Sequence, residues 1–462
     1  MVSWRAIGVY RGRGHYHTEH DHLIGSAWGH GNVTRSMLES RFVCMKIRSI
    51  TFGASLHERQ PRGTLLGSLG HAAAAATAAY NEAGYEVQTV RLATSPLPQL
   101  LATPGADPDP VRLALELEAG CRDAGIGFCS LGAIPAGRSD ASLGLIERIP
   151  EVIAATSNIF ASVQVGGAER ENGQLKGYVN LKATRRTAAA IRAIADSTPG
   201  GEGNLRFAAL ANCPPHIPFF PAAYYLPDAD SRPTLAIALE AADLAVAAFA
   251  AADSPEDAQV RLVGALERAS EVISPIAAHV AAEYRMRFAG IDLSLAPTPG
   301  EAVSIGRAFE LLTGGPFGGP ATLSAAAFLT DCLRRVRVPR TGYSGLMLPV
   351  LEDDILAAQA GQTYDVDSLL LYSAVCGLGL DTVPLPGDCT EIQLSGIIAD
   401  MATLAVRLDK PLTARLLPIP GARPGDPVSW NFFSIRAGHV VAVKPRRAAG
   451  LFATAAGLAF SD

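Results

Sequence analysis

The chain lacks the features that identify several large classes of protein. It has no long basic run, its net charge is −5, and only 18% of its 462 residues are charged, so neither nucleic acid nor a membrane surface is an expected partner. Its alanine-rich runs are too short, or too interrupted by charge, for the roughly 20 apolar residues of a membrane span, and no signal peptide is visible. The patterns CxxC, HExxH, GxSxG and GxGxxG are absent, so no redox-cofactor or nucleotide site is indicated.

The cysteines and the apolar content suggest where and how the chain folds. The seven cysteines are scattered and odd in number, which fits a reducing cytoplasm rather than a disulfide framework. Hydrophobic residues make up 48% of the chain, which is ample for a large core. We therefore expect a cytoplasmic globular protein.

The first 44 residues differ from the rest. They hold five of the ten histidines and two of the three tryptophans but show neither helical nor strand periodicity. The close histidines at 15–22 could chelate a transition metal, yet the missing periodicity favours an unstructured extension. We interpret residues 1–44 as that extension and residues 45–462 as a single domain.

From Met45 onward, strand-like and helix-like segments alternate, and no linker separates domains. Between Pro233 and Arg287 the strand signal disappears, and alanine/leucine periodicity predicts two or three helices inserted outside the sheet. The alternation predicts an α/β fold with a largely parallel sheet or barrel. About ten strand candidates are 45–53, 85–92, 126–131, 159–165, 205–211, 288–295, 343–350, 380–384, 412–417 and 439–443.

Two similar Pro/Gly/Asp turns stand out near the C-terminus. The predicted strand 380–385 ends at Pro386–Asp388, a helix follows over 390–409, and the strand 412–417 leads to the loop 420–426. A strand, crossover helix and strand are nearly always parallel and right-handed, so both loops should leave the same end of neighbouring strands. Ligands of α/β folds bind at that end.

Carboxylates in and beside these turns are the first candidates for chemistry. Asp381, Asp388, Glu391 and Asp426 could supply oxygen ligands to Mg²⁺ or Ca²⁺, or hold a proton for acid/base catalysis. A structural alternative exists for two of them, because Asp388 and Glu391 have the spacing of a capping box. Asp381 lies inside an apolar run, where an unpaired carboxylate would cost several kcal/mol. It therefore needs a partner.

Arg415 poses the complementary problem in the strand 412–417. A buried guanidinium requires a carboxylate or an anionic ligand. One interpretation is a structural ion pair between Asp381 and Arg415 across adjacent strands. The other makes Arg415 a clamp for a substrate carboxylate or phosphate.

Two further segments carry weaker signals. Thr313–Gly319 is glycine-rich but has no Gly-Lys-Ser/Thr ending, so we interpret it as a connecting turn rather than a nucleotide site. Cys213 and His216 are of ligand type, but no second pair completes a zinc set, which favours a shaped loop.

Several strings together resemble a known family. They are GLDTVPLPGD, RLLPIPG followed by PGD, NCPPHIPFFPAAYY, IDLSLAPTP and SGLMLPVLED. Through these separate strings, and over Met45 to the C-terminus, the chain resembles the domain of unknown function 711 family, also called uncharacterised protein family 0210. The resemblance implies a ten-stranded α/β barrel like that of pyruvate formate-lyase and anaerobic ribonucleotide reductase, and implies no established activity. The run Ser434–His439 differs in Arg–Gly spacing from the pyruvate formate-lyase radical loop, so no glycyl radical is expected.

The sequence therefore predicts a cytoplasmic α/β-barrel enzyme, of metal-assisted hydrolase or lyase type, that acts on a small anionic metabolite and forms a homo-oligomer. The alternative is a ligand-binding or regulatory protein that uses the same barrel mouth without catalysis. The candidate residues are Asp381, Asp388 and Arg415 for catalysis, Arg415, Gly387, Gly421, Asp426 and His216 for substrate binding, and Asp381, Asp388 and Glu391 for Mg²⁺ or Ca²⁺.

Overall fold

The computed structural model describes residues 45–56, 62–102, 108–137, 139–428, 430, 435–446 and 450–461. All of them belong to one unit of the chain, Cys44–Asp462. The predictions for residues 1–44, the extension and its histidine cluster, lie outside the described residues.

Eleven strands form one large sheet, and two short strands form a second. The strands of the large sheet are β1 (Lys46–Ala54), β2 (Val90–Thr94), β3 (Phe128–Pro135), β4 (Ile159–Glu171), β5 (Gln174–Asn180), β6 (Phe207–Ala211), β7 (Thr234–Glu240), β8 (Arg287–Ala296), β9 (Gly379–Pro386), β10 (Leu412–Ile419) and β13 (Gly457–Ser461). The second sheet pairs β11 (Pro427–Val428) with β12 (Gly438–His439).

Thirteen α-helices are present in the described part of the chain. They are α1 (Arg62–Glu82), α2 (Leu97–Leu101), α3 (Pro110–Asp123), α4 (Leu143–Ile146), α5 (Ile149–Ala155), α6 (Leu181–Ser197), α7 (Ala242–Ala250), α8 (Pro255–Glu283), α9 (Ile305–Thr313), α10 (Thr322–Arg335), α11 (Asp354–Gln359), α12 (Val366–Ser373) and α13 (Glu391–Arg407). None of the helices in these ranges is both long and apolar enough to cross a bilayer.

The main path of the large sheet runs β8-β7-β1-β2-β3-β4-β6-β10-β9. Its central block, β1-β2-β3-β4-β6, is parallel, and the pairs β7/β8 and β9/β10 are each parallel within themselves but antiparallel to the block. The expected α/β fold with a mostly parallel sheet is confirmed. The hydrogen-bonded path has two ends, β8 and β9, so a closed barrel is not established by its strand ladders.

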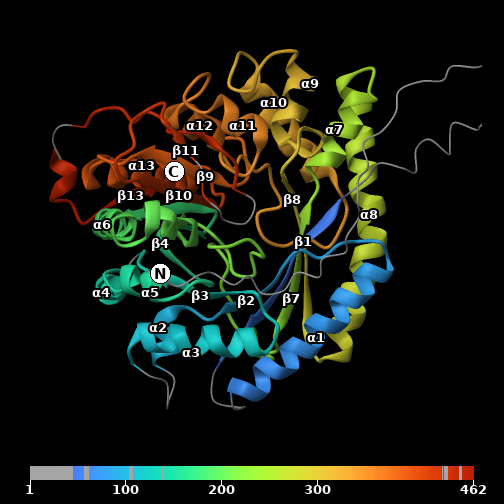
Figure 1. The fold of residues 1–462 in the computed structure, drawn as a ribbon, viewed down its shortest axis with the longest axis horizontal. Helices are drawn as coiled ribbons and strands as arrows, with labels where there is room; N and C mark the ends of the chain where they lie inside the picture. Colours follow the sequence, from blue (N-terminus) through green and yellow to red (C-terminus); the bar gives the residue numbers. More distant parts are fainter. Residues whose placement is uncertain are drawn as a thin grey trace, which may run out of the picture. The chain divides into compact units, whose positions relative to one another are not determined.

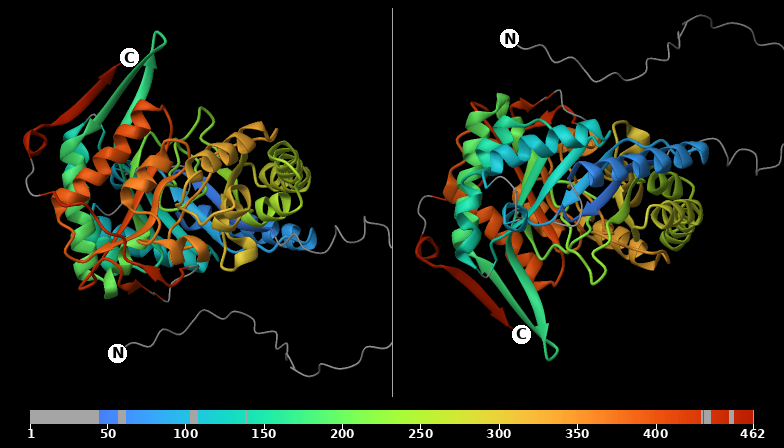
Figure 2. Two further views of the ribbon diagram at one scale, coloured as in Figure 1. Left: turned by 90° about the horizontal axis from the view of Figure 1, so that it is seen from above. Right: turned by 90° about the horizontal axis from the view of Figure 1, so that it is seen from below.

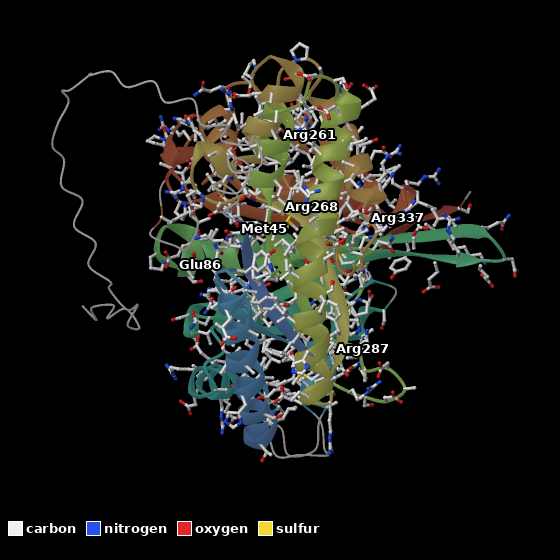
Figure 3. The ribbon with its side chains drawn as sticks, turned by 90° about the vertical axis from the view of Figure 1, so that its right-hand side faces the viewer. Met45, Glu86, Arg261, Arg268, Arg287 and Arg337 are labelled. Carbon is white, nitrogen blue, oxygen red and sulfur yellow. The ribbon has the colours of Figure 1, made fainter. Side chains whose placement is uncertain are left out.

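Helices cover the outer surface of this sheet (Figure 1). Helix α8 packs on β7 and β8, α3 packs on β3, and α6 and α13 pack against β4, β6 and β10. Figure 3 shows α1 beside α8, with Arg261 and Arg268 along α8, and the hydroxyl of Tyr80 on α1 donates to the carbonyl of Ile273 on α8 at 3.1 Å. The strands are buried on both faces because the other face also packs against protein.

That other face holds an irregular segment, residues 212–226. The hydroxyls of Ser49 and Thr51 on β1 donate to the carbonyl of Pro218, at 3.2 and 2.9 Å, and Ser130 on β3 donates to the carbonyl of Ala223 at 2.7 Å. Buried backbone polar groups must be satisfied, and these small hydroxyl residues satisfy a chain that has no strand partner. The string NCPPHIPFFPAAYY is thereby held against the sheet.

The buried carboxylate of Asp292 on β8 holds the backbone of Tyr343 and Ser344 beside that strand. Asp292 on β8 accepts hydrogen bonds from the backbone amides of Ser294, Tyr343 and Ser344 at 3.0, 2.8 and 2.9 Å, and from the Ser294 hydroxyl at 2.6 Å. Burial raises the pKa of Asp292 to about 6, while these four hydrogen bonds oppose the shift. Tyr343 is fixed in place as a result.

The strands β4 and β5 extend beyond the helices as a hairpin, and β13 lies along it (Figure 2). Strand β13 pairs antiparallel with β5 from Gly457–Asn180 to Ser461–Lys176. Neither β5 nor β13 was expected from the sequence, because the periodicity of both is short and the glycines Gly173 and Gly177 weaken the pattern.

Most predicted strands are confirmed within a few residues, and three predictions need correction. The segment 343–350 contains no strand, and the helical insertion at 233–287 begins with the strand β7 before α7 and α8. Strand β7, TLAIALE, is fully buried, so its alanine-rich sequence lacks the alternation of a half-exposed strand. Only His439 of the predicted strand 439–443 lies in a strand, β12.

The turn regions also test two predictions. Thr313–Gly319 connects α9 to α10 as a turn, with Gly314 in the left-handed conformation at the end of α9, as expected. The capping box of α13 is formed by Thr390 and Gln393, not by Asp388 and Glu391, because the helix begins two residues later than that assignment requires.

One exposed residue is predicted to limit the stability of the fold. Ala321 precedes α10 with φ +73°, a conformation that costs an L-residue roughly 1–2 kcal/mol, more than the roughly 0.5–1 kcal/mol of extra unfolded-state entropy of glycine. We expect Ala321→Gly to raise the free energy of unfolding by about 0.5–1 kcal/mol in urea denaturation. The matched variant Ala327→Gly, at an exposed right-handed position of the same helix, should lower it by about 1 kcal/mol. Equal losses in both variants would contradict this.

Candidate functional site

A network of buried charges links four strands of the sheet. Arg48 on β1 donates to Glu240 on β7 at 2.6 Å and to Glu352 at 2.5 Å. The other carboxylate oxygen of Glu352 accepts from Arg415 on β10 at 2.7 Å, and Arg415 Nε donates to Asp381 on β9 at 2.6 Å. Glu352 therefore holds two guanidinium groups from opposite parts of the sheet.

Irregularities in the strand register aim two of these side chains. Along β1 and β7, Ile47 pairs with Leu239 and Ser49 with Ala238, so Arg48 is the extra residue of a bulge. Bulges bend a strand locally and redirect the side chain at that point. Arg48 reaches both carboxylates from this position.

A second bulge lies between β9 and β10. Ala414 pairs with Leu380 and Leu416 with Val383, so Arg415 faces both Asp381 and Thr382. Thr382 has φ +46°, and a β-branched residue in this region costs roughly 1–3 kcal/mol. Such strain persists where the surrounding structure imposes it.

The bulge in β9 also positions Glu352. The amide of Val350 donates to the carbonyl of Asp381 at 3.0 Å, and the amide of Leu351 donates to the hydroxyl of Thr382 at 3.1 Å. The residue after these two is Glu352. Its contact with Arg415 thus depends on the strained backbone of β9.

Beside the network lies a cavity of about 60 Å³. Its polar lining comes from Arg48, Arg91, Tyr343, Glu352, Asp381, Thr413 and Arg415, and its apolar lining from Phe128, Phe160, Phe219, Phe220, Pro221, Ala222, Ala296, Pro297, Met347, Pro349 and Leu378. Tyr343 forms a hydrogen bond with Thr413, and its hydroxyl lies 3.6 Å from the Cys213 sulfur. The cavity thus has a charged side, an aromatic side and a hydroxyl pair.

Arg91 differs from the other two arginines of the cavity. Its Nε donates to Thr89 at 2.9 Å, and its guanidinium lies 5.9 Å from the ring centre of Phe128 and 5.3 Å from that of Phe220. No carboxylate in the described part of the chain lies within ion-pairing distance of it, although only 6% of Arg91 is exposed. It is a buried cation with aromatic neighbours and room for an anion.

The pKa values of the cavity reflect this contrast. Burial, and then the neighbouring Arg48, lower the pKa of Arg91 to about 9, so its guanidinium is still charged at neutral pH. Burial also disfavours the charge of Arg415, but Asp381 and Glu352 outweigh it and raise its pKa. Burial opposes ionisation of Glu352, yet Arg415 and Arg48 hold its pKa below the ordinary value.

Asp381 shifts in the opposite direction from Glu352. Burial raises its pKa, Arg415 counteracts this, and the negative charge of Glu352 adds to the rise. Glu352 has two guanidinium partners, whereas Asp381 shares its only one with Glu352. Of these two carboxylates, Asp381 is therefore the one that takes up a proton more readily.

The structure brings together Asp381 and Arg415 but places the other candidates elsewhere. The loops after β9 and β10 do lie side by side, as expected, since the Gly387 amide donates to the Ala422 carbonyl at 2.9 Å. They lie at the opposite end of β9 from the cavity, because seven residues from Asp381 to Asp388 span roughly 23 Å in a strand. Among the lining residues are none of Gly387, Asp388, Glu391, Gly421 and Asp426.

His216 is also outside the cavity lining. Its ring lies 3.3 Å from Arg287 Nη2 and 3.4 Å from the Thr234 hydroxyl, and it packs edge-on against Tyr225. Burial, and then Arg287, lower the pKa of His216 to about 4, so it is neutral at physiological pH. These contacts give His216 a structural role, which is to hold the segment 212–226 in place.

The expected ligand set for a hard cation is not assembled. Asp381 pairs with Arg415, while Asp388 and Glu391 lie at the far end of β9 and at the start of α13. Within the described ranges, no group of three or more His, Cys, Asp or Glu side chains is arranged to hold a metal ion. The residues therefore do not fit the predicted Mg²⁺ or Ca²⁺ site, because oxygen ligands must converge on one point.

Arg48, Arg91, Glu240 and Glu352 were missed from the sequence. Arg48 carries the same signal that singled out Arg415, an arginine within an apolar strand, IRSITFG. Glu352 lies in the string SGLMLPVLED, but nothing local shows that it faces two arginines. Arg91 is the second residue of β2, and from the sequence alone its position resembles a solvated strand end.

Comparisons with known proteins place the chain in a family. The family model described as "Uncharacterised ACR (DUF711)" matches residues 36–431. The chain belongs to this family. It is 33% identical over 360 residues to the UPF0210 protein of Pyrobaculum islandicum, covering 74% of this chain and 76% of that one.

Members from bacteria are similarly related to the chain. The UPF0210 protein of Desulfovibrio desulfuricans is 29% identical over 372 residues, covering 75% and 78% of the two chains. The UPF0210 protein NMC1568 of Neisseria meningitidis is 29% identical over 371 residues, covering 77% and 79%. The family expected from the sequence is confirmed, and since its names state no activity, function must be argued from the site.

The network predicts an order of stability among isosteric variants. Glu352→Gln removes the charge shared by two buried guanidiniums and should cost about 3–5 kcal/mol. Asp381→Asn should cost less, about 1–3 kcal/mol, because Arg415 keeps Glu352. Denaturation midpoints measured by circular dichroism check this, with exposed Glu151→Gln as the control expected near zero.

The difference in stability between the native chain and Glu352→Gln depends on pH, because the pKa of Glu352 is lowered in the folded chain. Its stabilising contribution is present above its ordinary pKa of 4.5 and is lost as pH falls through the lower, folded-state pKa. The difference between the native chain and Glu352→Gln should therefore shrink in acid. A larger loss in Asp381→Asn than in Glu352→Gln would refute this account of the network.

Proposed function

We propose that the cavity binds a small anionic metabolite through Arg91 and that the chain is an enzyme of hydrolase or lyase type acting on it. One observation carries the proposal: Arg91 is a buried guanidinium that lines a cavity and has no carboxylate partner among the described residues. A buried charge without compensation is expensive. A bound anion would supply the compensation, and a planar guanidinium suits carboxylate and phosphate oxygens.

Asp381 is the proposed proton donor or acceptor. It lines the cavity, its pKa is raised by burial, and its neighbour Thr382 is strained. Shifted carboxylates and strained backbone are both common at catalytic sites. The proposal routes no step through a metal, because the candidate ligands do not converge.

Arg415 has a supporting role in this proposal rather than the role of anion clamp. It donates to Asp381, Glu352 and the carbonyl of Leu205, at 2.6, 2.7 and 3.3 Å. It therefore positions both carboxylates. Tyr343 and Thr413, which also line the cavity, are hydrogen-bonded to each other through their hydroxyls.

The rival function is a ligand-binding or regulatory protein that uses the same cavity. The ion pairs of Arg48 and Arg415 favour this rival, because side chains whose charges are already paired can be structural without taking part in catalysis. The raised pKa of Asp381 favours the enzyme. Proton NMR in deuterated buffer separates them: conversion or deuterium exchange of an added anion, abolished in Asp381→Asn, supports catalysis, whereas binding without either supports the rival.

Three further features belong to the same proposal: a closed barrel, a cytoplasmic location and a homo-oligomeric state. We propose that the sheet closes as a ten-stranded barrel through residues 340–349, supported by isolated parallel bridges from Arg340 to Ile291 on β8 and from Pro349 to Asp381 on β9. A cytoplasmic setting is supported by six buried cysteines that form no disulfide in the described ranges. A homo-oligomer is supported by the exposed Leu451 and Phe452.

The anion site is tested by removing the charge of Arg91. Sodium salts of formate, acetate, propionate and phosphate should raise the melting temperature of the native chain above that in sodium chloride of equal ionic strength. Arg91→Met should abolish the shift, because it removes the cavity guanidinium that has no carboxylate partner among the described residues. Arg334→Met, an exposed arginine of α10, is the matched control and should keep it. An unchanged shift in Arg91→Met would refute the site.

Anion binding should also take up a proton. The added negative charge raises the pKa of Asp381 further above its ordinary value, so binding weakens as pH rises through the folded-state pKa. Calorimetry in two buffers of different ionisation enthalpy should show uptake of a fraction of a proton, up to about one, at pH values around the folded-state pKa of Asp381. Asp381→Asn should bind with no uptake. Equal uptake in this variant would show that another group takes the proton.

A further inference from the structure

The charge balance around the cavity restricts what its ligand can carry. Three guanidiniums, Arg48, Arg91 and Arg415, meet three carboxylates, Glu240, Glu352 and Asp381, in one buried region. Every carboxylate is held by Arg48 or Arg415. Arg91 alone among the three guanidiniums has no carboxylate within ion-pairing distance in the described residues, so one cation is open to a ligand.

A second negative group on the ligand would find no counter-charge. The other polar groups that line the cavity with Asp381 and Glu352 are Arg48, Arg91, Arg415 and the hydroxyls of Tyr343 and Thr413. Two of the three arginines are already paired at 2.5–2.7 Å. An added carboxylate away from Arg91 would therefore face Glu352 or Asp381 and be repelled.

The rest of the lining is apolar. Phe128, Phe160 and Phe220 pack edge-to-face, with ring centres 5.3 and 5.2 Å apart, around the guanidinium of Arg91. Phe219 and Met347 continue this wall. Groups of the ligand beyond its charged end thus meet carbon rather than hydrogen-bond donors.

The size of the cavity limits these groups. Its volume is about 60 Å³, well below the roughly 300–1,000 Å³ of pockets that take drug-sized ligands. The carboxylate of the ligand takes up part of this space. Only a short chain is left.

We propose that the ligand is a small monocarboxylate with a short apolar remainder, selected against dicarboxylates and phosphate. This rests on the proposed function of the same cavity and names its substrate class. Arg91 binds the carboxylate, the phenylalanine wall covers the chain, and the carboxylate of Glu352 rejects further negative charge.

A series of acids tests the selectivity. Calorimetry with the full chain should give increasing affinity from acetate to propionate, by roughly fourfold for one buried methylene, and loss of affinity for benzoate, which exceeds the cavity. Malonate, which differs from propionate by exchanging a methyl for a carboxylate, should bind at least about tenfold more weakly. Inorganic phosphate should bind more weakly than propionate as well.

A cavity variant links the selectivity to the wall. Phe219 is only partly buried, so Phe219→Ala should fold, as its melting temperature will show, and should bind benzoate at least as well as propionate. Phe452→Ala, an exposed phenylalanine outside the cavity, should leave the order of acids unchanged. This pair separates cavity size from general effects of losing an aromatic ring.

The outcomes distinguish this inference from the function on which it rests. Binding of malonate or phosphate as tight as that of propionate, lost in Arg91→Met, would overturn the monocarboxylate class and leave the anion site standing. Binding of no acid, or binding that Arg91→Met does not affect, would overturn both. Unaltered preference in Phe219→Ala would overturn the role of the wall.

Discussion

The shared carboxylate of Glu352 is the interaction on which the site depends. It lies between Arg48 on β1 and Arg415 on β10, strands separated by β2, β3, β4 and β6 along the sheet. Each guanidinium would be costly to bury alone. By accepting from both, Glu352 allows two buried cations to face one cavity and ties the connection between α10 and α11 to both ends of the network.

The strands accept irregular geometry to make this contact. The bulge at Arg48, the bulge at Asp381 and the left-handed Thr382 all cost ladder hydrogen bonds or backbone energy. A fully regular sheet would place apolar side chains at these positions, and a hydrophobic replacement of a buried ion network is often as stable. The bulges and the buried charges therefore favour a role in binding, because a ligand site needs charged side chains held in fixed positions.

Sequence patterns predicted most of the buried strands, but of the charged network they predicted only the pair of Asp381 and Arg415. The apolar runs of β1, β4, β8, β9 and β10 were evident because buried parallel strands are continuously hydrophobic. The buried pair of Asp381 and Arg415 followed from the cost of a lone charge in such a run. Strand β7 was missed because TLAIALE has the composition of a helix, and its burial comes from neighbours 190 residues or so away in the chain.

The partners of the pair could not be predicted, since their positions depend on long-range register. Glu352 reaches Arg415 through hydrogen bonds of Val350 and Leu351 to a bulge, and no local pattern encodes a bulge in a partner strand. The general rule for α/β ligand sites pointed to the carboxyl ends of β9 and β10. The cavity instead lies beside Arg48, Arg91 and Asp381, in the first halves of β1, β2 and β9, and beside Ala296 at the end of β8.

This arrangement also decides between two ways in which an anion can bind. An anion that displaced Asp381 from Arg415 would leave a buried carboxylate without its partner and would itself lie beside Glu352, at a cost of several kcal/mol. An anion at Arg91 breaks no ion pair and meets a guanidinium that the described chain leaves without a carboxylate. Because burial already lowers the pKa of Arg91, a bound negative charge would restore the preference for its charged form. In the proposed function, the pair of Asp381 and Arg415 is thus the scaffold of the site, and Arg91 is the residue that contacts the ligand.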